Sequence, residues 1–342
     1  MALKVYEASY SGGFMASWHY SMNGDGSLGE CFFTSERGDW NGSDWLIVPE
    51  NSHSCFFTDI PRERRILFAL EPPEIRSFPS YYLEQFGHVV NISDISGYSG
   101  NVIVTNPKLG WTAGLSSELS TYSKVMNYSV PTKTRELSII SSLKHKTKYH
   151  RKRIALMREL QREFPGVIDC YGREFNPVGD KLDAIVPYKY HVVIENSRHA
   201  NYWTEKLTDA WVGWSLPIYC GDPEILKHVP DKRGIVIIDV DDTASAIARI
   251  REVVADDVYS SRVDAISRCR HWALKESNMY EAAREIIAGY KGDASRLERP
   301  ELFRRMVSPR KNLVYSSLKL VSHDFADKIF MKYHRMKGRF LE

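Results

Sequence analysis

Several polar side chains lie between two apolar runs in the sequence YKYHVVIENSRHANYWTEKLTDAWVGWSLPIYCG. Glu195, Asn196 and Ser197 end the first run, and Glu205 and Lys206 follow a few residues later. Open α/β sheets bind their ligands at the carboxyl ends of strands. A lysine there can pair with phosphate, and a carboxylate can accept hydrogen bonds from ribose hydroxyl groups. The pattern favours a nucleotide diphosphate site, although both charged residues would also suit the start of any helix.

The residues after this loop have the spacing of an amphipathic helix. Leu207, Ala210, Trp211 and Trp214 fall on one helical face, which we expect to be buried. Thr204 is a suitable N-cap. The free backbone N–H groups and the dipole at the start of this helix would favour an anion such as a diphosphate.

A second source of positive charge is the run KHKTKYHRKR, which contains six Lys or Arg and no acid. A guanidinium fork can bind phosphate oxygens at two points, so we expect at least one residue of this run to reach the site. Only this short run is strongly basic and few aromatic residues interleave it, which argues against a nucleic-acid partner.

The elements that position these residues follow from short apolar runs bounded by Pro, Asn and Gly. The first part of the chain shows strand patterns at DWLIVPE, RRILFALEPPE, GHVVNIS, NVIVTNP and ELSIISS, with a short helix at FPSYYLEQFG. From residue 144 on, a helix at 149–163 leads into strands GVIDCYG, YHVVIEN, LPIYCG and GIVIID. Helices are expected at TEKLTDAWVGW, TASAIARIREVV, DDVYSSRVDAISRCRHWAL and MYEAAREIIAGY. The alternation predicts two Rossmann-like, doubly wound α/β domains, at 1–143 and 144–310, followed by a tail at 311–342.

The central segment resembles the signature of the α-1,3/1,4-fucosyltransferase family, through Y-K-Y, an apolar run, E-N-S, Y-W-T-E-K, a helix and P-I-Y-C-G. The resemblance extends upstream to DCYGR and to the helix opening near Arg153, and it is weak in the N-terminal domain. It implies a GT-B fold with two domains facing a cleft and an N-terminal domain that binds the acceptor. It also implies GDP-fucose as donor and transfer of fucose to an acceptor glycan, in an α-1,3 or α-1,4 linkage to N-acetylglucosamine. It further implies inversion at the anomeric carbon and no obligatory metal or other cofactor.

The same resemblance assigns donor-binding roles. Tyr202, Glu205 and Lys206 match the family's donor motif, Asn196 matches the asparagine of E-N-S, and Arg153 falls near a phosphate-binding arginine. Basic neighbours leave the last assignment open by a residue or two. Four further residues are possible members of the site: Glu195, Ser197, Lys144 and Arg151.

An inverting displacement needs a base that takes the proton of the acceptor hydroxyl. Glu71 ends an apolar strand, and Pro72 and Pro73 after it stop the strand. The stretch LFALEPPE also resembles the family's glutamate-before-proline element, with Pro72 where a Ser is common. Glu74 and Glu50 are rival bases. Alternatively, Glu71 is a strand-end carboxylate paired with an arginine of the preceding PRERR.

Other interpretations remain open at this level. Asp239 and Asp241 in IIDVDDTAS resemble the metal clamp of Mn-dependent transferases, although Asp242 serves equally well as a helix N-cap. His191 is more plausible as a core imidazole than as a catalyst, and His199 could reach the sugar or the acceptor. The chain could also use another GDP-sugar on the same fold, or be a non-catalytic glycan-binding protein derived from a transferase.

Composition is consistent with an ordinary globular protein. The 342 residues are 43% hydrophobic and 26% charged with a net charge of +3, and the five scattered cysteines indicate neither a disulfide framework nor a zinc site. No signal peptide or membrane-spanning run is evident, so we expect a cytoplasmic location. The basic amphipathic tail predicts either a helix packed on the domains or peripheral contact with the anionic inner face of a membrane.

Overall fold

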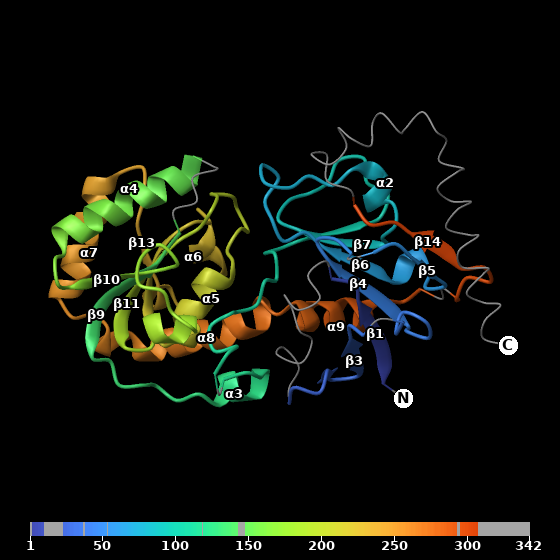
Figure 1. Cartoon of the computed structure of the whole chain (residues 1–342), viewed down its shortest axis with the longest axis horizontal. Coiled ribbons are helices and arrows are strands. Elements are labelled where there is room, and N and C mark those ends of the chain that lie inside the picture. The colour runs from blue at the N-terminus through green and yellow to red at the C-terminus, as the bar shows by residue number, and fades with distance from the viewer. Residues whose placement is uncertain are drawn as a thin grey trace. The chain divides into compact units, whose positions relative to one another are not determined.

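The computed structural model describes residues 2–9, 23–36, 38–52, 54–117, 119–142, 148–292 and 295–306. Its two main sheets are largely parallel, as predicted (Figure 1). The first sheet has, in spatial order, strands β2 (Ser27–Leu28), β3 (Cys31–Thr34), β1 (Leu3–Glu7), β4 (Trp45–Pro49), β6 (Arg65–Phe68), β7 (His88–Asn91) and β8 (Asn101–Val104). Only the β2–β3 pair is antiparallel. Every residue of β4 and β6 is buried, which explains their unbroken apolar runs.

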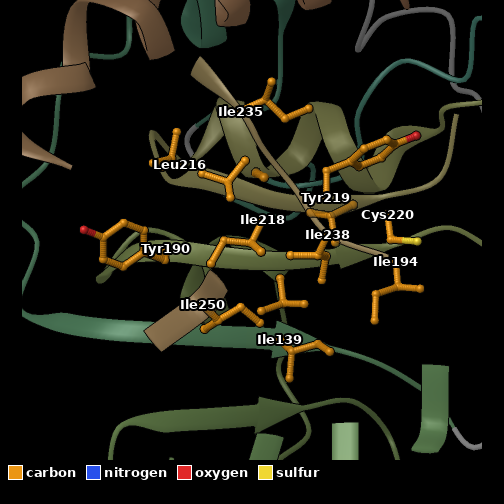
Figure 2. Close-up of a cluster of buried hydrophobic side chains, with 14 of the residues drawn as sticks. Ile139, Tyr190, Ile194, Leu216, Ile218, Tyr219, Cys220, Ile235, Ile238 and Ile250 are labelled. Atoms are coloured by element: carbon orange, nitrogen blue, oxygen red, sulfur yellow. The ribbon is translucent and has the colours of Figure 1, made fainter. Parts of the chain in front are cut away.

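The second sheet is parallel throughout. Its strands, in spatial order, are β10 (Ile168–Tyr171), β9 (Arg135–Ile140), β11 (Tyr188–Ile194), β12 (Leu216–Cys220) and β13 (Val236–Ile237). Its core is a cluster of aliphatic and aromatic side chains from neighbouring strands, including Ile139, Tyr190 and Ile218 (Figure 2). The centre of this sheet, β11, delivers the polar loop of the candidate site.

Helices cover and connect the two sheets (Figure 1). The α-helices are α2 (Ser80–Leu83), α3 (Tyr122–Asn127), α4 (Lys148–Glu163), α5 (Glu205–Val212), α6 (Ile225–His228), α7 (Thr243–Ala255), α8 (Val263–Glu276) and α9 (Met279–Gly289). The 3-10 turns are η1 (Arg62–Arg64), η2 (Lys181–Ala184), η3 (Lys232–Gly234) and η4 (Ser260–Arg262). The helices predicted at 149–163, 204–214, 243–254 and 279–290 are present with small differences in their ends. The helix predicted from Asp256 begins only at Val263, after the turn η4. None of the helices described here has the length and apolar character needed to cross a lipid bilayer.

The chain does not divide between the two sheets at residue 143, where we expected the domain boundary. Strand β9, which we assigned to the first domain, lies inside the second sheet between β10 and β11. Helix α9 packs into the core of the first sheet, and β14 (Glu301–Phe303) pairs antiparallel with β5 (Phe56–Thr58). An apolar strand pattern does not specify which sheet the strand joins, and amphipathicity does not specify the surface a helix covers. The tail at 311–342 lies outside the described residues.

The first sheet's core also includes side chains that come from the second half of the chain. Leu182, Ile185, Val212 and Leu274 belong to the same cluster as Val5, Ile47 and the other inward residues of the first sheet. The described residues up to Arg304 therefore form one compact unit that contains both sheets.

Candidate active site

Helix α5 begins as predicted, with Thr204 as its N-cap. The Thr204 hydroxyl accepts a hydrogen bond from the Lys206 backbone N–H at 3.4 Å. Leu207, Ala210 and Trp211 are completely buried, so packing fixes the helix axis. The amino end of α5 therefore lies just after the carboxyl end of β11, where backbone donors and the helix dipole favour negative charge.

Glu195 closes the loop between β11 and α5. Its Oε1 accepts a hydrogen bond from the Thr204 backbone N–H at 2.8 Å, and its Oε2 accepts one from the Thr204 hydroxyl at 2.8 Å. The carboxyl is 1% exposed, and burial raises its pKa. Lys206 lies 3.4 Å from Oε2 and supplies the opposing charge. Glu195 thus holds the loop in place, because both of its oxygens are already used within the protein.

Lys206 and Glu205 form the charged centre of this site. The Lys206 Nζ atom donates to the Thr204 hydroxyl at 2.9 Å and lies 3.2 Å from Glu205 Oε1. Burial opposes the charge on Glu205, but Lys206 and Lys181 outweigh it and hold the pKa of the Glu205 carboxyl at about 2. The adjacent carboxylates, Glu205 first, likewise raise the pKa of Lys206 in spite of burial. Both side chains are therefore ionised at neutral pH.

Arg153 lies on the buried face of α4 and points to the same loop. It is 5% exposed; its Nη1 donates to Asn196 Oδ1 at 2.9 Å, and its Nη2 contacts the carbonyl and hydroxyl oxygens of Ser142 at 3.3 Å. The Nε atom is buried without a hydrogen-bond partner. Among the described residues, no carboxylate forms an ion pair with this guanidinium. A buried cation with an unused donor is suited to bind an anion.

The other basic residues of the α4 start are placed differently. Arg151 is exposed, and Lys152 forms an ion pair with Asp241. Of Arg151, Lys152 and Arg153, only Arg153 is buried, because it falls on the inward face of the helix. Lys144 lies outside the described residues.

Glu71 is the one of the three candidate bases that has a carboxylate oxygen without a hydrogen-bond partner in the described residues. Its Oε2 is buried and has no hydrogen-bond partner. Burial, followed by the negative charge of Glu50, raises the pKa of Glu71, while Lys206 lowers it. This carboxyl follows β6 of the first sheet, and Glu74, three residues later, contacts Ser197 of the loop between β11 and α5. The predicted pairing with an arginine of PRERR is not seen in the described residues, where Arg62 pairs with Glu84 and Arg65 with Glu301.

The two rival bases already have partners. Glu50 accepts hydrogen bonds from the backbone of Leu70 and Glu71 and forms an ion pair with Arg76. The Glu74 carboxylate accepts a hydrogen bond from the Ser197 hydroxyl, and both of its oxygens lie 2.8 Å from His199 Nε2. Their carboxylates are therefore less available to an acceptor hydroxyl than Glu71 Oε2, which has no partner in the described residues.

Tyr202, Ser197 and Asn196 complete the loop. Tyr202 is 1% exposed, and burial followed by nearby carboxylates, Glu195 first, raises the pKa of its hydroxyl. Ser197 is buried against Glu74, so it joins segments that follow different sheets. Asn196 orients Arg153. The structure thus brings the predicted residues of the loop together with Arg153 and Glu71.

The aspartates of DVDD have other partners. Arg198 pairs with Asp239 at 3.0 Å, Lys152 pairs with Asp241, and Asp242 caps α7 by accepting from the Ser245 N–H at 3.0 Å. In the part of the chain that the structure describes, no group of three or more His, Cys, Asp or Glu side chains could hold a metal ion.

Sequence reasoning missed Lys181 and Asp209. The Lys181 Nζ atom lies 2.7 Å from Asp209 Oδ2 and 3.8 Å from Glu205 Oε1. The Asp209 carboxylate also accepts from the backbone N–H groups of Thr112 and Ala113 at 2.7 and 2.8 Å. Together they tie α5 to a segment almost a hundred residues earlier. No local motif marks these residues, because their partners are distant in sequence.

Comparison with known proteins provides the context for this geometry. The family model described as glycosyltransferase family 10 (fucosyltransferase), C-terminal, matches residues 130–263, the region that contains β9 to α7 and the loop between β11 and α5. The chain is similar to the human 3-galactosyl-N-acetylglucosaminide 4-alpha-L-fucosyltransferase, with 24% identity over 76% of this chain and 75% of the relative. It is 27% identical to a 4-galactosyl-N-acetylglucosaminide 3-alpha-L-fucosyltransferase of Gorilla gorilla gorilla, over 36% of this chain but only 38% of the relative.

Solved structures give the same result for the fold. The crystal structure of an alpha1,3-fucosyltransferase with GDP matches with a TM-score of 0.52 and 17% identity, covering 85% of this chain and 91% of the other. The corresponding structure with GDP-fucose matches with a TM-score of 0.51 and 15% identity, covering 87% and 93%. The two Rossmann-like sheets therefore have the GT-B fold that the sequence predicted.

Proposed function

We propose that this chain is a member of glycosyltransferase family 10, the fucosyltransferases, and that it transfers fucose from GDP-fucose to a hydroxyl group of an acceptor glycan, with inversion. The observation that carries the proposal is the pairing of two features. Glu71 has a buried carboxylate oxygen without a partner, and it lies in the segment whose Glu74 contacts Ser197 of the loop before α5. The lysine at the capped start of α5, Lys206, lowers the pKa of Glu71.

The donor would bind through the elements that meet at the start of α5. Lys206 and Arg153 supply positive charge to the diphosphate, and the amino end of α5 adds backbone donors. Asn196 and Tyr202 shape the same loop, and Glu205 offers a carboxylate to ribose hydroxyl groups. Glu195 and Ser197 act indirectly, because their polar atoms already hold the loop.

Transfer would then proceed by direct displacement. The acceptor oxygen attacks the anomeric carbon of fucose while its proton passes to Glu71 Oε2, and the bond to GDP breaks with the electron pair remaining on the diphosphate. Lys206 and Arg153 stabilise the negative charge that develops there. The raised pKa of Glu71 suits a base that operates near neutral pH.

The acceptor is proposed from the relatives rather than from this site. The names of the similar human and gorilla enzymes describe transfer to galactosyl-N-acetylglucosaminides through 4- and 3-linkages. We therefore propose an N-acetylglucosamine acceptor and an α-1,3 or α-1,4 linkage.

A donor panel tests the proposed reaction. Purified protein is incubated with GDP-fucose, GDP-mannose, UDP-galactose or UDP-N-acetylglucosamine and an N-acetyllactosamine acceptor, and the product mass is measured with and without EDTA. We expect a fucosylated product from GDP-fucose alone and equal rates in EDTA. Turnover of another donor with GDP-fucose ignored would remove the fucosyl assignment, and loss of activity in EDTA would favour a metal-dependent enzyme.

Membrane contact by the basic amphipathic tail remains a prediction from sequence. Its basic residues alternate with aromatic and aliphatic ones at helical spacing, which suits an anionic lipid surface. Co-sedimentation with phosphatidylserine vesicles, compared with pure phosphatidylcholine vesicles, tests it. Equal recovery with both lipids would contradict an electrostatic contact.

A further inference from the structure

We propose that Glu50 is a positioning residue that holds Glu71 in place and sets its affinity for a proton. The inference rests on the proposed function, in which Glu71 is the base. Glu50 was a rival for that role, but its contacts assign it a different one.

Strand register brings the two residues together. Strands β4 and β6 are parallel neighbours, with Pro49 opposite Phe68. The Glu50 backbone N–H continues the ladder by donating to the Phe68 carbonyl oxygen at 2.8 Å. Both glutamates therefore leave the same edge of the sheet, one strand apart.

The Glu50 side chain then binds the backbone that carries Glu71. A single carboxylate oxygen, Oε1, accepts from the N–H of Leu70 at 3.1 Å and from the N–H of Glu71 at 2.9 Å. These two donors lie beyond the last ladder pair of β6. Charge-assisted hydrogen bonds restrict the backbone that donates them. Glu50 therefore fixes the backbone of Leu70 and Glu71 where it leaves the sheet.

Glu50 is itself fixed by contacts of its side chain and its backbone. Its Oε2 lies 2.6 Å from Arg76 Nε, and its carbonyl oxygen accepts from the Tyr82 hydroxyl at 3.3 Å. Its backbone has a φ of 64°, in the left-handed region that few residues other than glycine adopt. Such a conformation persists only where the surroundings enforce it, and it often occurs at functional sites.

The charge of Glu50 acts on the same group. The charged groups that face Glu71 are Glu50 and Glu205, which raise its pKa, and Lys206 and Arg76, which lower it. Glu50 has the largest effect after burial. Arg76 forms an ion pair with Glu50, so its positive charge partly offsets the negative charge that Glu50 places near Glu71.

Two substitutions separate the positioning effect from the charge. Glu50→Gln keeps a side-chain oxygen for the two N–H groups but removes the negative charge, whereas Glu50→Ala removes both. We expect Glu50→Gln to move the acidic limb of the pH profile of kcat/KM down by about 0.5–1 pH unit, with plateau kcat within about threefold of wild type. We expect Glu50→Ala to lower the plateau kcat by roughly 10- to 100-fold while the GDP dissociation constant stays within about twofold.

Glu36→Gln, an exposed change of the same charge in the first sheet's region, is the matched control and should leave the profile unchanged. If a thermal melt shows that Glu50→Ala does not fold, the acidic limb of the kcat/KM profile of Glu50→Gln is the deciding measurement. An unmoved limb with full kcat in both variants overturns the inference. Full turnover by Glu71→Gln would instead overturn the proposed base, so the two failures are distinguishable.

Discussion

At the scale of single residues, hydrogen-bond occupancy separates three glutamates that look alike in sequence. Glu50 and Glu74 are engaged by neighbours, and Glu71 keeps a buried oxygen without a partner. A base has to offer a lone pair to the incoming hydroxyl, so this difference favours Glu71 as the base that we propose.

Replacing the base should remove catalysis and spare donor binding. We expect Glu71→Gln to lower kcat by about 10²–10⁴-fold, because the amide cannot take up the acceptor proton. Calorimetry should show GDP affinity within a few-fold of wild type. Glu74→Gln is the matched control, since it changes a neighbouring carboxylate that we place outside the chemistry. A larger kcat loss in the control would reverse the assignment.

Removing either cation should weaken nucleotide binding. We expect Lys206→Ala and Arg153→Ala each to reduce GDP affinity by about 1.5–3 kcal/mol, as for other charge-assisted hydrogen bonds. Arg151→Ala provides the control, because Arg151 is on the same helix but exposed. Isothermal titration with GDP measures all three, and equal losses for Arg151 and Arg153 would show a general charge effect instead of a specific contact.

A buried glutamate far from this chemistry should make stability depend on pH. Glu7 ends β1, its Oε2 accepts from the Tyr280 hydroxyl, and burial raises its pKa from 4.5 to about 8. The folded protein therefore holds this proton more tightly than the unfolded chain, and the associated stability is complete below about pH 4.5 and lost as pH rises through 8.

Glu7→Gln should remove that dependence. We compare the unfolding free energy of the variant with that of wild type at each pH. We expect this difference, variant minus wild type, to be roughly 1–3 kcal/mol larger at pH 8.5 than at pH 5. Urea unfolding of both proteins at the two pH values measures it. A constant difference between the proteins at both pH values would show that Glu7 ionises normally.

At the scale of elements, the start of α5 links stability to binding. The Thr204 hydroxyl accepts a hydrogen bond from the Lys206 N–H and donates one to Glu195. One side chain therefore both caps the helix and closes the loop. We expect Thr204→Ala to lower the unfolding free energy by about 1–2 kcal/mol and also to weaken GDP binding.

Thr121 offers a matched control for this prediction. It caps α3 in the same way, by accepting from the Lys124 N–H at 3.4 Å. Thr121→Ala should lower stability by a similar amount and leave GDP affinity unchanged. If both variants bind GDP like wild type, the cap of α5 serves folding alone.

Sequence periodicity predicted the individual helices and strands better than it predicted which elements lie next to one another. The apolar stripe of Leu207, Ala210 and Trp211 and the cap at Thr204 were predicted correctly, because helix spacing and capping are local properties. Trp214, which we expected on the same helical face, is buried but lies after the end of α5 with a φ of 59°. Strands β1 and β3 were not identified, since they are short and lie next to Gly- and Ser-rich sequence. Strand β9 was identified but assigned to the wrong sheet.

At the scale of the whole molecule, the candidate site depends on contacts that sequence does not reveal. Glu71 and Glu74 follow the first sheet, whereas Lys206, Ser197 and His199 follow the second. The polar residues of the loop between β11 and α5 could be picked out from the sequence because they are close along the chain, whereas their distant partners Lys181 and Asp209 could not. The choice of base depended on which distant groups occupy each carboxylate, and this became visible only in three dimensions.

The most direct test of the whole account is a crystal structure with GDP bound. We predict that the diphosphate lies at the amino end of α5, with Lys206 Nζ and the Arg153 guanidinium each within hydrogen-bond distance of a phosphate oxygen. GDP bound at another surface, with both cations still engaged only by protein groups, would contradict the central claim.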